Sequence, residues 1–177
     1  MYHYTRHSGD KALCTSRNCP PGELRQLFEH MQREEQGHYR LAESDLNALG
    51  YAAHASKPPA VEAFDRYWAS IGPEQYTAYV GAIVVFENVA SHLASEIAEL
   101  LRRLRLANTQ SRWLRVHAEA DREHGLQAIT ASQRYLREDP EGVLRGAERA
   151  GQLWQVSSAL RSKIGLRYVR CLRPSIR

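Results

Sequence analysis

The sequence predicts an all-α fold, built as a bundle of helices. Apolar residues recur every three to four positions through most of the 177-residue chain, which is the period of an amphipathic helix. No stretch of useful length alternates between apolar and polar residues, so strands are not expected. The periodic segments are separated by short stretches that contain Pro, Gly or Asn, and helices joined by such short loops pack side by side.

The first predicted helix begins near Pro20–Glu23 and ends at Gly50. Proline is favoured in the first turn of a helix and glycine just past its end, and a stripe of apolar residues joins the two points. The residues before it, 1–20, show no periodicity and are expected to form a flexible lead-in. A second, short helix is predicted over about residues 61–71, where Gly72-Pro73 stops it.

Three further helices follow. The third is marked by a long apolar stripe, the fourth follows a break at Asn108-Thr109, and the fifth starts at Asp139-Pro140-Glu141 with proline in its first turn. We expect one helical domain followed by a short basic tail. The predicted ranges are about 76–104, 110–137 and 139–172 for the three helices, 21–172 for the domain and 173–177 for the tail.

Composition and charge narrow the function classes. Hydrophobic residues make up 43% of the chain and charged residues 25%, which is ordinary for a globular domain. No apolar run is long enough to span a bilayer and no signal peptide is evident, so we expect a cytoplasmic protein without a membrane partner. Much of the net charge of +4 lies in the last predicted helix and the tail. We find neither a basic stripe interleaved with aromatic residues nor a known nucleic-acid-binding motif, so no nucleic-acid partner is expected. The three cysteines, an odd number, argue against a disulfide framework.

The fourth predicted helix carries the most informative pattern, H-x3-D-x2-H, formed by His117, Asp121 and His124. Residues at i, i+4 and i+7 of a helix lie within roughly 60° of one another, on a stripe that is normally apolar. Three polar side chains on such a stripe are costly to bury unless something satisfies them. A metal ion would do so.

Two other predicted helices place polar residues on their buried stripes. Glu35 and His38 form an E-x2-H pair on the first helix. Glu34 is also spaced to meet His38 but lies off the apolar stripe, so Glu35 is the preferred residue. On the third helix, Glu87 ends the apolar run of residues 80–86 and shares its stripe. Three helices are therefore each expected to direct acids or imidazoles into the core.

Together these residues have the composition of a metal centre in a helical bundle. Di-iron and di-manganese sites combine single carboxylates with acid-x2-His pairs, and three carboxylates offset most of the charge of two divalent ions. The alternatives are a metal-free binding or scaffold protein, in which the same residues form a buried polar network, and an iron-binding module of ferritin type without substrate turnover. The candidate metal ligands are Glu35, His38, Glu87, His117, Asp121 and His124.

At these residues the sequence resembles the haem-oxygenase-like di-iron oxidases and oxygenases, which are related in fold to haem oxygenase and the thiaminase-like proteins. The similarity runs from about Leu24 to Tyr135 and implies a haem-oxygenase-like helical bundle. Its parts are Glu34–His38 with Asp45-Leu46 and Leu49-Gly50, then Tyr79-Val80 with Phe86-Glu87-Asn88, then His117, Asp121 and His124. The resemblance also implies two iron sites that share a bridging carboxylate, one held by Glu35, His38 and His117 and the other by Glu87, Asp121 and His124.

The activity that the resemblance implies is that of an enzyme, a non-haem di-iron oxidoreductase that uses O2 to oxidise a small organic substrate. The expected substrate is an amine or an amino-acid-like molecule, and the expected reaction is N-oxygenation or oxidative C–C cleavage. The expected cofactor is a pair of iron ions, with manganese left open as the native metal, and O2 is the co-substrate. No catalytic residue is predicted beyond the metal ligands.

The N-terminal region departs from the family's pattern. Family members usually have one or two more helices before the first ligand pair, whereas only about thirty residues precede Glu35 here. The pocket wall that those helices supply is therefore expected to come from elsewhere, for example from a partner subunit. A homodimer is left open.

Overall fold

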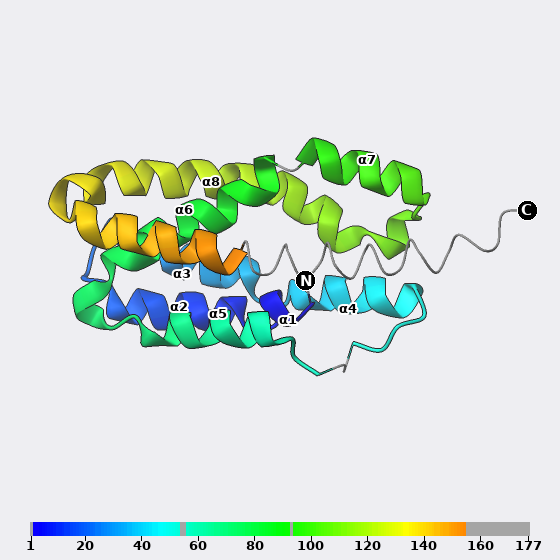
Figure 1. Ribbon diagram of the computed structural model, residues 1–177, viewed down its shortest axis with the longest axis horizontal. Helices are drawn as coiled ribbons and strands as arrows, with labels where there is room; N and C mark the ends of the chain where they lie inside the picture. The colour runs from blue at the N-terminus through cyan, green and yellow to red at the C-terminus, as the bar shows by residue number, and fades with distance from the viewer. Residues whose placement is uncertain (1, 54–55, 93, 155–177) are drawn as a thin grey trace, which may run out of the picture.

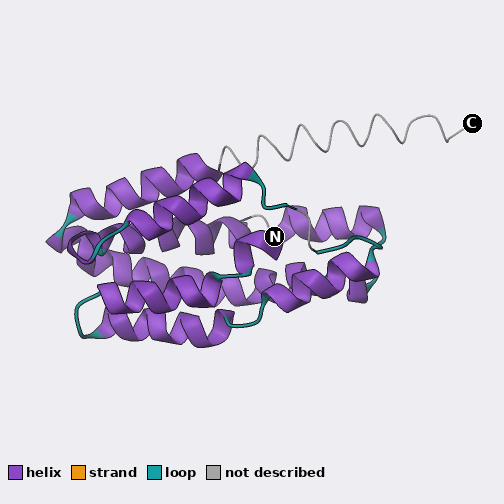
Figure 2. Cartoon of the chain, turned by 90° about the horizontal axis from the view of Figure 1, so that it is seen from below, coloured by secondary structure: helices purple, strands orange, loops and turns teal. Residues whose placement is uncertain are grey.

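The computed structural model describes residues 2–53, 56–92 and 94–154, without the side chains of residues 89–92, 94, 118, 119 and 121. Over these residues all regular structure is helical, as Figure 2 shows, and the predicted all-α fold is confirmed. The elements are α1 (Tyr2–Thr5), α2 (Ser8–Asn18), α3 (Glu23–Glu35), α4 (Tyr39–Ala48), α5 (Pro59–Ser70), η1 (Pro73–Gln75), α6 (Thr77–His92), α7 (Ala94–Leu104), η2 (Asn108–Gln110), α8 (Arg112–Glu138) and a helical segment over 140–154.

Most helices run along the long axis of the molecule, with α1 to α5 on one side and α6, α7, α8 and the segment 140–154 on the other (Figure 1). The most extensive pairings are α6 with α8 and α2 with α3. At one end of the molecule α4 contacts both η2 and α8. These pairings bring α3, α4, α6 and α8, the helices with the candidate ligands, to a common interior.

The helix α6 approaches the segment 140–154 at very short range. A Cβ atom at Gly81 would overlap the backbone carbonyl oxygen of Val143, and one at Gly146 would overlap the carbonyl oxygen of Ala78. Both obstacles are backbone atoms, which cannot swing aside as the end of a side chain can. The two glycines are therefore needed for the close approach of these helices.

The core surrounds the aromatic side chains of α5 and α6. Trp68 and Tyr79 are both buried, and their ring centroids lie 5.2 Å apart. The indole N–H of Trp68 donates to the hydroxyl of Thr15 (3.0 Å), and the hydroxyl of Tyr79 donates to the carbonyl oxygen of Ile71 (2.7 Å). Both buried polar atoms are thus satisfied. Because Thr15 belongs to α2, the first of these bonds also attaches the N-terminal helices to the core.

The prediction of a flexible lead-in over residues 1–20 is wrong. Residues 2–5 and 8–18 form α1 and α2, and α2 packs along α3. The buried face of α2 is made of small or hydroxyl-bearing residues, namely Gly9, Ala12, Thr15 and Ser16. Such a face lacks the large apolar side chains by which an amphipathic helix is recognised, so a hydrophobic pattern does not reveal it.

The first predicted helix, over 21–50, is in fact two helices, α3 and α4, separated by Gln36–His38. Gly37 in this break has a φ of +94°, a left-handed conformation that glycine adopts without strain. Both helices bury the same side, so the apolar stripe continues from α3 into α4 and the sequence pattern does not indicate the break. The predicted helix over 76–104 covers α6 and α7, and residue 93 between them lies outside the described residues.

The other predicted helices are confirmed, with shifts of one or two residues at most of their ends. The second is α5 and the fourth is α8. The fifth follows Asp139, which accepts hydrogen bonds from the backbone N–H of Gly142 (2.9 Å) and from the hydroxyl of Thr77. Its predicted continuation beyond residue 154 and the basic tail over 173–177 lie outside the described residues.

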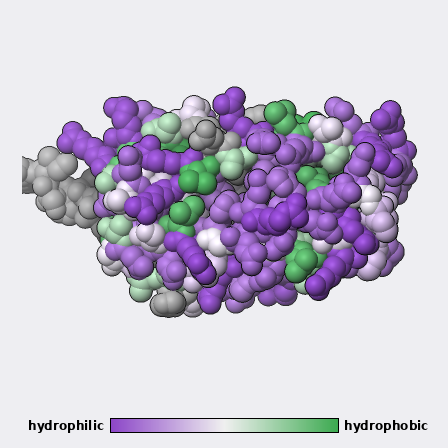
Figure 3. All heavy atoms as spheres, turned by 180° about the vertical axis from the view of Figure 1, so that it is seen from behind, coloured by the Kyte–Doolittle hydropathy of each residue, from purple (hydrophilic) through white to green (hydrophobic). Residues whose placement is uncertain are grey.

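The surface seen from behind is largely hydrophilic, with separated apolar spots (Figure 3). In the described part of the chain, no helix combines the length and the apolar composition of a membrane span. The assignment of residues 21–172 to one domain stays a prediction.

Candidate metal centre

Glu35 and His38 lie together at the break between α3 and α4. Glu35 is the last residue of α3, and His38 immediately precedes α4. The Nδ1 of His38 lies 3.2 Å from Oε1 of Glu35, and both side chains are largely buried. The E-x2-H spacing therefore joins the pair around a turn at a helix end, and not along the face of one continuous helix.

A third side chain reaches Glu35 from the N-terminal helices. The hydroxyl of Ser8, at the start of α2, lies 3.1 Å from Oε2 of Glu35 and 2.8 Å from the carbonyl oxygen of Thr5. Each carboxylate oxygen of Glu35 thus has its own partner, His38 on one oxygen and Ser8 on the other. Ser8 helps to fix the orientation of this carboxylate, a contribution that the sequence did not predict.

His117 approaches the same pair from α8. It is 6% exposed, and its ring stacks on that of Trp113 at a centroid distance of 3.9 Å. Nδ1 of His117 lies 2.9 Å from the carbonyl oxygen of Trp113. A carbonyl only accepts, so Nδ1 carries the proton and Nε2 presents a lone pair. That Nε2 atom is buried and has no hydrogen-bond partner among the described residues.

The position of His117 depends on how α8 begins. Asp45 of α4 accepts hydrogen bonds from the backbone N–H groups of Arg112 (3.0 Å) and Trp113 (2.8 Å). The first turn of a helix leaves such donors without partners, and a carboxylate there also complements the helix dipole. The buried Asp45 side chain thus attaches the start of α8 to the helix that follows His38.

Glu35, His38 and His117 form one compact group. Each can offer a ligand atom such that all three atoms lie within 4.8 Å of one another. The ring centroids of His38 and His117 lie 5.0 Å apart, with the ring planes 75° from parallel. Two imidazoles and one carboxylate at this spacing are a suitable donor set for an iron, manganese or zinc ion.

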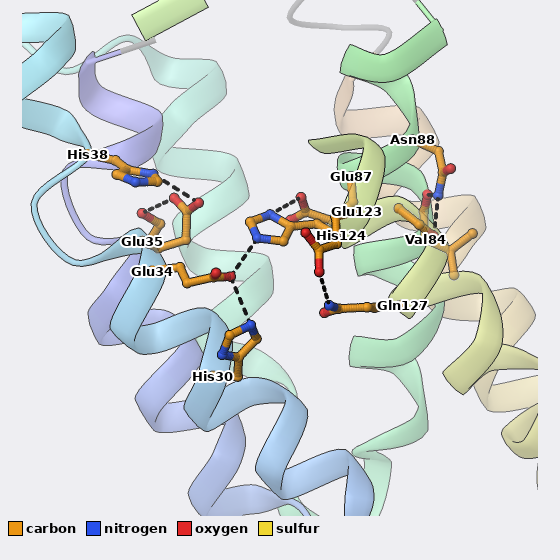
Figure 4. A network of polar contacts seen from close by, with 12 residues as sticks. His30, Glu34, Glu35, His38, Val84, Glu87, Asn88, Glu123, His124 and Gln127 are labelled. Atoms are coloured by element: carbon orange, nitrogen blue, oxygen red, sulfur yellow. Dashed lines mark hydrogen bonds and ion pairs between the residues drawn. The ribbon is translucent and has the colours of Figure 1, made fainter. Parts of the chain in front are cut away.

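The second group is centred on His124 (Figure 4). Its Nε2 lies 2.7 Å from Oε2 of Glu34, a hydrogen bond, and its Nδ1 lies 3.4 Å from Oε2 of Glu87. The contact with Glu87 has the distance of an ion pair but not the geometry of a hydrogen bond, so Nδ1 counts as unpaired within the described part of the chain. His124 is thus held between a carboxylate from α3 and a carboxylate from α6.

Burial and neighbouring carboxylates move the pKa values of the two buried imidazoles in opposite directions. The contact with Glu87 and, after it, the contact with Glu34 raise the pKa of His124 to about 9, although burial opposes them. Burial lowers the pKa of His117 below its ordinary value, although the charge of Glu35 opposes it. The Nε2 lone pair of His117 is therefore available at neutral pH.

A cavity of about 170 Å³ adjoins both groups. Glu35, Glu87 and His117 line one part of its wall. Most of the rest is apolar and includes Phe28, Met31, Phe64, Trp68, Ile83 and Phe86. The N-terminal helices α1 and α2 supply Tyr4, Thr5, Ser8, Lys11 and Ala12. The part of the pocket wall that was expected to come from elsewhere, for example from a partner subunit, therefore comes from the N-terminal helices of this chain. The homodimer stays a prediction.

The structure brings five of the six predicted ligand side chains to this interior: Glu35, His38, Glu87, His117 and His124. The side chain of Asp121 lies outside the described residues, although its backbone belongs to α8. Glu34 does lie off the buried stripe, as predicted, with 40% of its side chain exposed. It contacts His124, however, and no sequence pattern indicates a contact between residues 90 positions apart.

The donor atoms suit a metal cation. Nε2 of His117 and Nδ1 of His124 are buried and lack hydrogen-bond partners in the described part of the chain, and each belongs to a group that contains a carboxylate. A buried lone pair without a partner, as on Nε2 of His117, is costly unless a cation satisfies it, and at Nδ1 of His124 a metal ion would take the place of the proton that the raised pKa holds there. Mixed imidazole and carboxylate donors are those that iron and manganese bind in helical bundles.

Comparisons with known proteins bear on both fold and family. A family model described as an iron-containing redox enzyme matches residues 1–155. A crystal structure of a domain of unknown function with a heme oxygenase-like fold, from Shewanella denitrificans, matches with a TM-score of 0.71 at 22% sequence identity, covering 91% of this chain and 77% of that chain. At this identity the likeness shows the fold alone, and the predicted haem-oxygenase-like fold is confirmed. No curated protein matches this sequence.

Proposed function

This chain belongs to the family of iron-containing redox enzymes, and we propose that it is an O2-dependent, non-haem di-iron oxidoreductase that oxidises a small organic substrate. In this proposal Glu35, His38 and His117 hold one iron. Glu87, Asp121 and His124 hold the other.

One observation carries the proposal. Two buried imidazoles, His117 and His124, each have one nitrogen fixed by a hydrogen bond and the other nitrogen without a hydrogen-bond partner among the described residues. A buried polar network in a metal-free scaffold would be expected to pair these atoms with one another or with the carboxylates. A pair of cations accounts for both unpaired nitrogens at once.

The two iron ions, when bound, supply the redox chemistry that activates O2. The chain contributes the geometry. Asp45 and the ring of Trp113 fix the start of α8 and the plane of His117, while Ser8 fixes the carboxylate of Glu35. The apolar wall of the cavity excludes bulk water from the reacting atoms, which strengthens electrostatic interactions and limits side reactions.

The volume of the cavity indicates a small substrate. An apolar cavity of about 150 Å³ is large enough for benzene, so the cavity of about 170 Å³ suits a molecule of similar size. Lys11 lines this cavity, and its ammonium forms an ion pair with Asp65 (2.5 Å), which also binds Lys57 (2.6 Å). Lys11 thus places an ammonium at the cavity wall, where the carboxylate of an amino-acid-like substrate would meet it, while Glu35 and Glu87 line the same cavity with the opposite charge.

The test is O2 consumption by the protein loaded anaerobically with ferrous iron and supplied with a chemical reductant, which returns the iron to the ferrous state after each turnover. We expect O2 uptake that increases when a small amino acid or amine of the right size is present, with N-oxygenated or C–C-cleaved products found by mass spectrometry. His117→Ala, which removes one ligand, should abolish both. O2 uptake that no member of a broad amine and amino-acid panel affects would argue for an iron-binding module without turnover.

A further inference from the structure

We propose that Glu34 is a positioning residue for His124. It accepts a hydrogen bond from the Nε2–H of the imidazole, so that His124 meets a metal ion through Nδ1, on the side of Glu87. The proposal rests on the proposed function, because it states how one ligand of that metal centre is oriented.

Glu34 and His124 are in direct contact. Nε2 of His124 and Oε2 of Glu34 lie 2.7 Å apart, a short distance typical of a charge-assisted hydrogen bond. The side chain of His124 is 5% exposed, so solvent competes little for its Nε2–H. The bond joins α3 to α8 beside the break that positions Glu35 and His38, as Figure 4 shows.

The other ring nitrogen of His124 faces Glu87. Nδ1 of His124 is buried, lacks a hydrogen-bond partner in the part of the chain that the structure describes, and lies 3.4 Å from Oε2 of Glu87. An imidazole whose Nε2–H is held by a carboxylate can bind a metal only through Nδ1. Histidine ligands of metals almost always donate their other N–H to a carboxylate, a carbonyl or water, which fixes the ring and raises its basicity.

His117 provides an internal comparison. Its Nδ1–H is held by the carbonyl of Trp113, and its Nε2 is the buried nitrogen without a partner among described residues. In both histidines one ring nitrogen is held by a hydrogen bond within the protein and the other has no such partner among the described residues. The held nitrogen is Nδ1 in His117 and Nε2 in His124. The difference lies in the partner, a neutral carbonyl for His117 and a carboxylate for His124.

The position of Glu34 favours an orienting role over a direct bond to metal. Its side chain is 40% exposed and does not line the cavity, whereas Glu87 does. The oxygen that binds His124 also lies 3.2 Å from Nε2 of His30, one turn earlier on α3. His30 therefore holds the carboxylate from the solvent side, and the free edge of His124 faces Glu87 (Figure 4).

The experiment compares the wild-type protein with Glu34→Ala, Glu34→Gln and a control, Glu29→Gln, which neutralises another carboxylate of α3. Each protein is titrated anaerobically with ferrous iron against a competing chelator, and the affinity of each of the two ions is fitted. Glu34→Ala is expected to weaken one ion by about 10- to 100-fold. Glu34→Gln should weaken it less, because its amide oxygen still accepts the hydrogen bond, and the control should match the wild type.

A cobalt(II)-substituted sample adds a spectroscopic signature. The ion shifts the proton of the Nε2–H of His124 outside the ordinary range of the NMR spectrum, and we expect a slowly exchanging signal in the wild type that exchanges rapidly or disappears in Glu34→Ala. If Glu34 contributed to folding only, Glu34→Ala would lower the melting temperature but leave the exchange of the Nε2–H signal of His124 unchanged. Should Glu34→Ala not fold, Glu34→Gln gives the same two readouts.

If the wild-type protein binds both ions, two results would overturn the positioning role of Glu34 and leave the proposed function standing. One is wild-type affinity for both ions in Glu34→Ala. The other is complete loss of one ion in both Glu34→Ala and Glu34→Gln, matching His124→Ala, which would make Glu34 a ligand. Failure of the wild-type protein to retain any metal would instead refute the proposed function, and the positioning role with it.

Discussion

His124 makes the stability of the metal-free protein depend on pH in a way that follows from the structure. The contacts with Glu87 and Glu34 raise its pKa from 6.5 to about 9. A folded-state pKa above the unfolded value means that the folded protein binds this proton more tightly than the unfolded chain does. The stabilisation is therefore fully present below about pH 6.5 and is lost as the pH rises through about 9.

The size of the effect comes from the difference between the two pKa values. Each unit of that difference corresponds to about 1.4 kcal/mol, so the rise from 6.5 to about 9 contributes about 3 kcal/mol to the free energy of unfolding. The side chain of His124 is 5% exposed, so screening by solvent removes little of this contribution. Against a typical total of about 5–15 kcal/mol, the effect is large enough to measure.

The assay is urea unfolding in the presence of a chelator, for the wild type and for His124→Gln, from about pH 6 to about pH 9.5. We expect the wild type to be more stable at the acidic end, with the difference shrinking towards zero as the pH rises. The pKa of His38 is also raised, mainly through its hydrogen bond with Glu35. This residue contributes to the pH dependence of both proteins, so its effect largely cancels in the difference between them. A difference that stays constant across the whole range would refute the reasoning.

Three other substitutions test single contacts. Ser8→Ala removes a hydroxyl that orients the first ligand carboxylate and should weaken one metal ion by about 10-fold or more in a competitive titration, with helical content unchanged. Asp45→Ala leaves two N–H groups at the start of α8 without their partner and should lower the free energy of unfolding by about 1–3 kcal/mol in urea, with Asp45→Asn losing less. Gly81→Ala sets a methyl group against the backbone of Val143 and should lower the free energy of unfolding by at least about 1–3 kcal/mol in the same assay. Gly151→Ala is the control: a Cβ atom there meets nothing within 4 Å, so this change should be neutral or stabilising.

The fold was predictable where large apolar side chains mark the buried face. The helices α5 and α8 follow the period of such residues closely, and Asp139 marks a helix start that the structure confirms, whereas α5 begins at Pro59, two residues before its predicted start. The helix α2 was missed because it buries glycine, alanine, threonine and serine, whose burial leaves no hydrophobic stripe. The break at Gly37 was missed because two short helices that bury the same side read as one.

The candidate site was predictable as far as it is local. His117 and His124 were found because polar residues on a buried helical stripe are unusual within a single element. The contacts of Ser8 with Glu35 and of Glu34 with His124 join residues 27 and 90 positions apart, so only the packing of the helices reveals them. The assignment of these side chains as metal ligands stays a prediction.

Anaerobic titration of the metal-free protein with ferrous iron, followed by metal analysis after desalting, tests the account most directly. We predict two iron ions retained per wild-type chain and a clear loss of iron in His117→Ala, with the helices of the variant still formed. A wild-type chain that retains no iron, or a His117→Ala variant that retains as much as the wild type, would contradict the account.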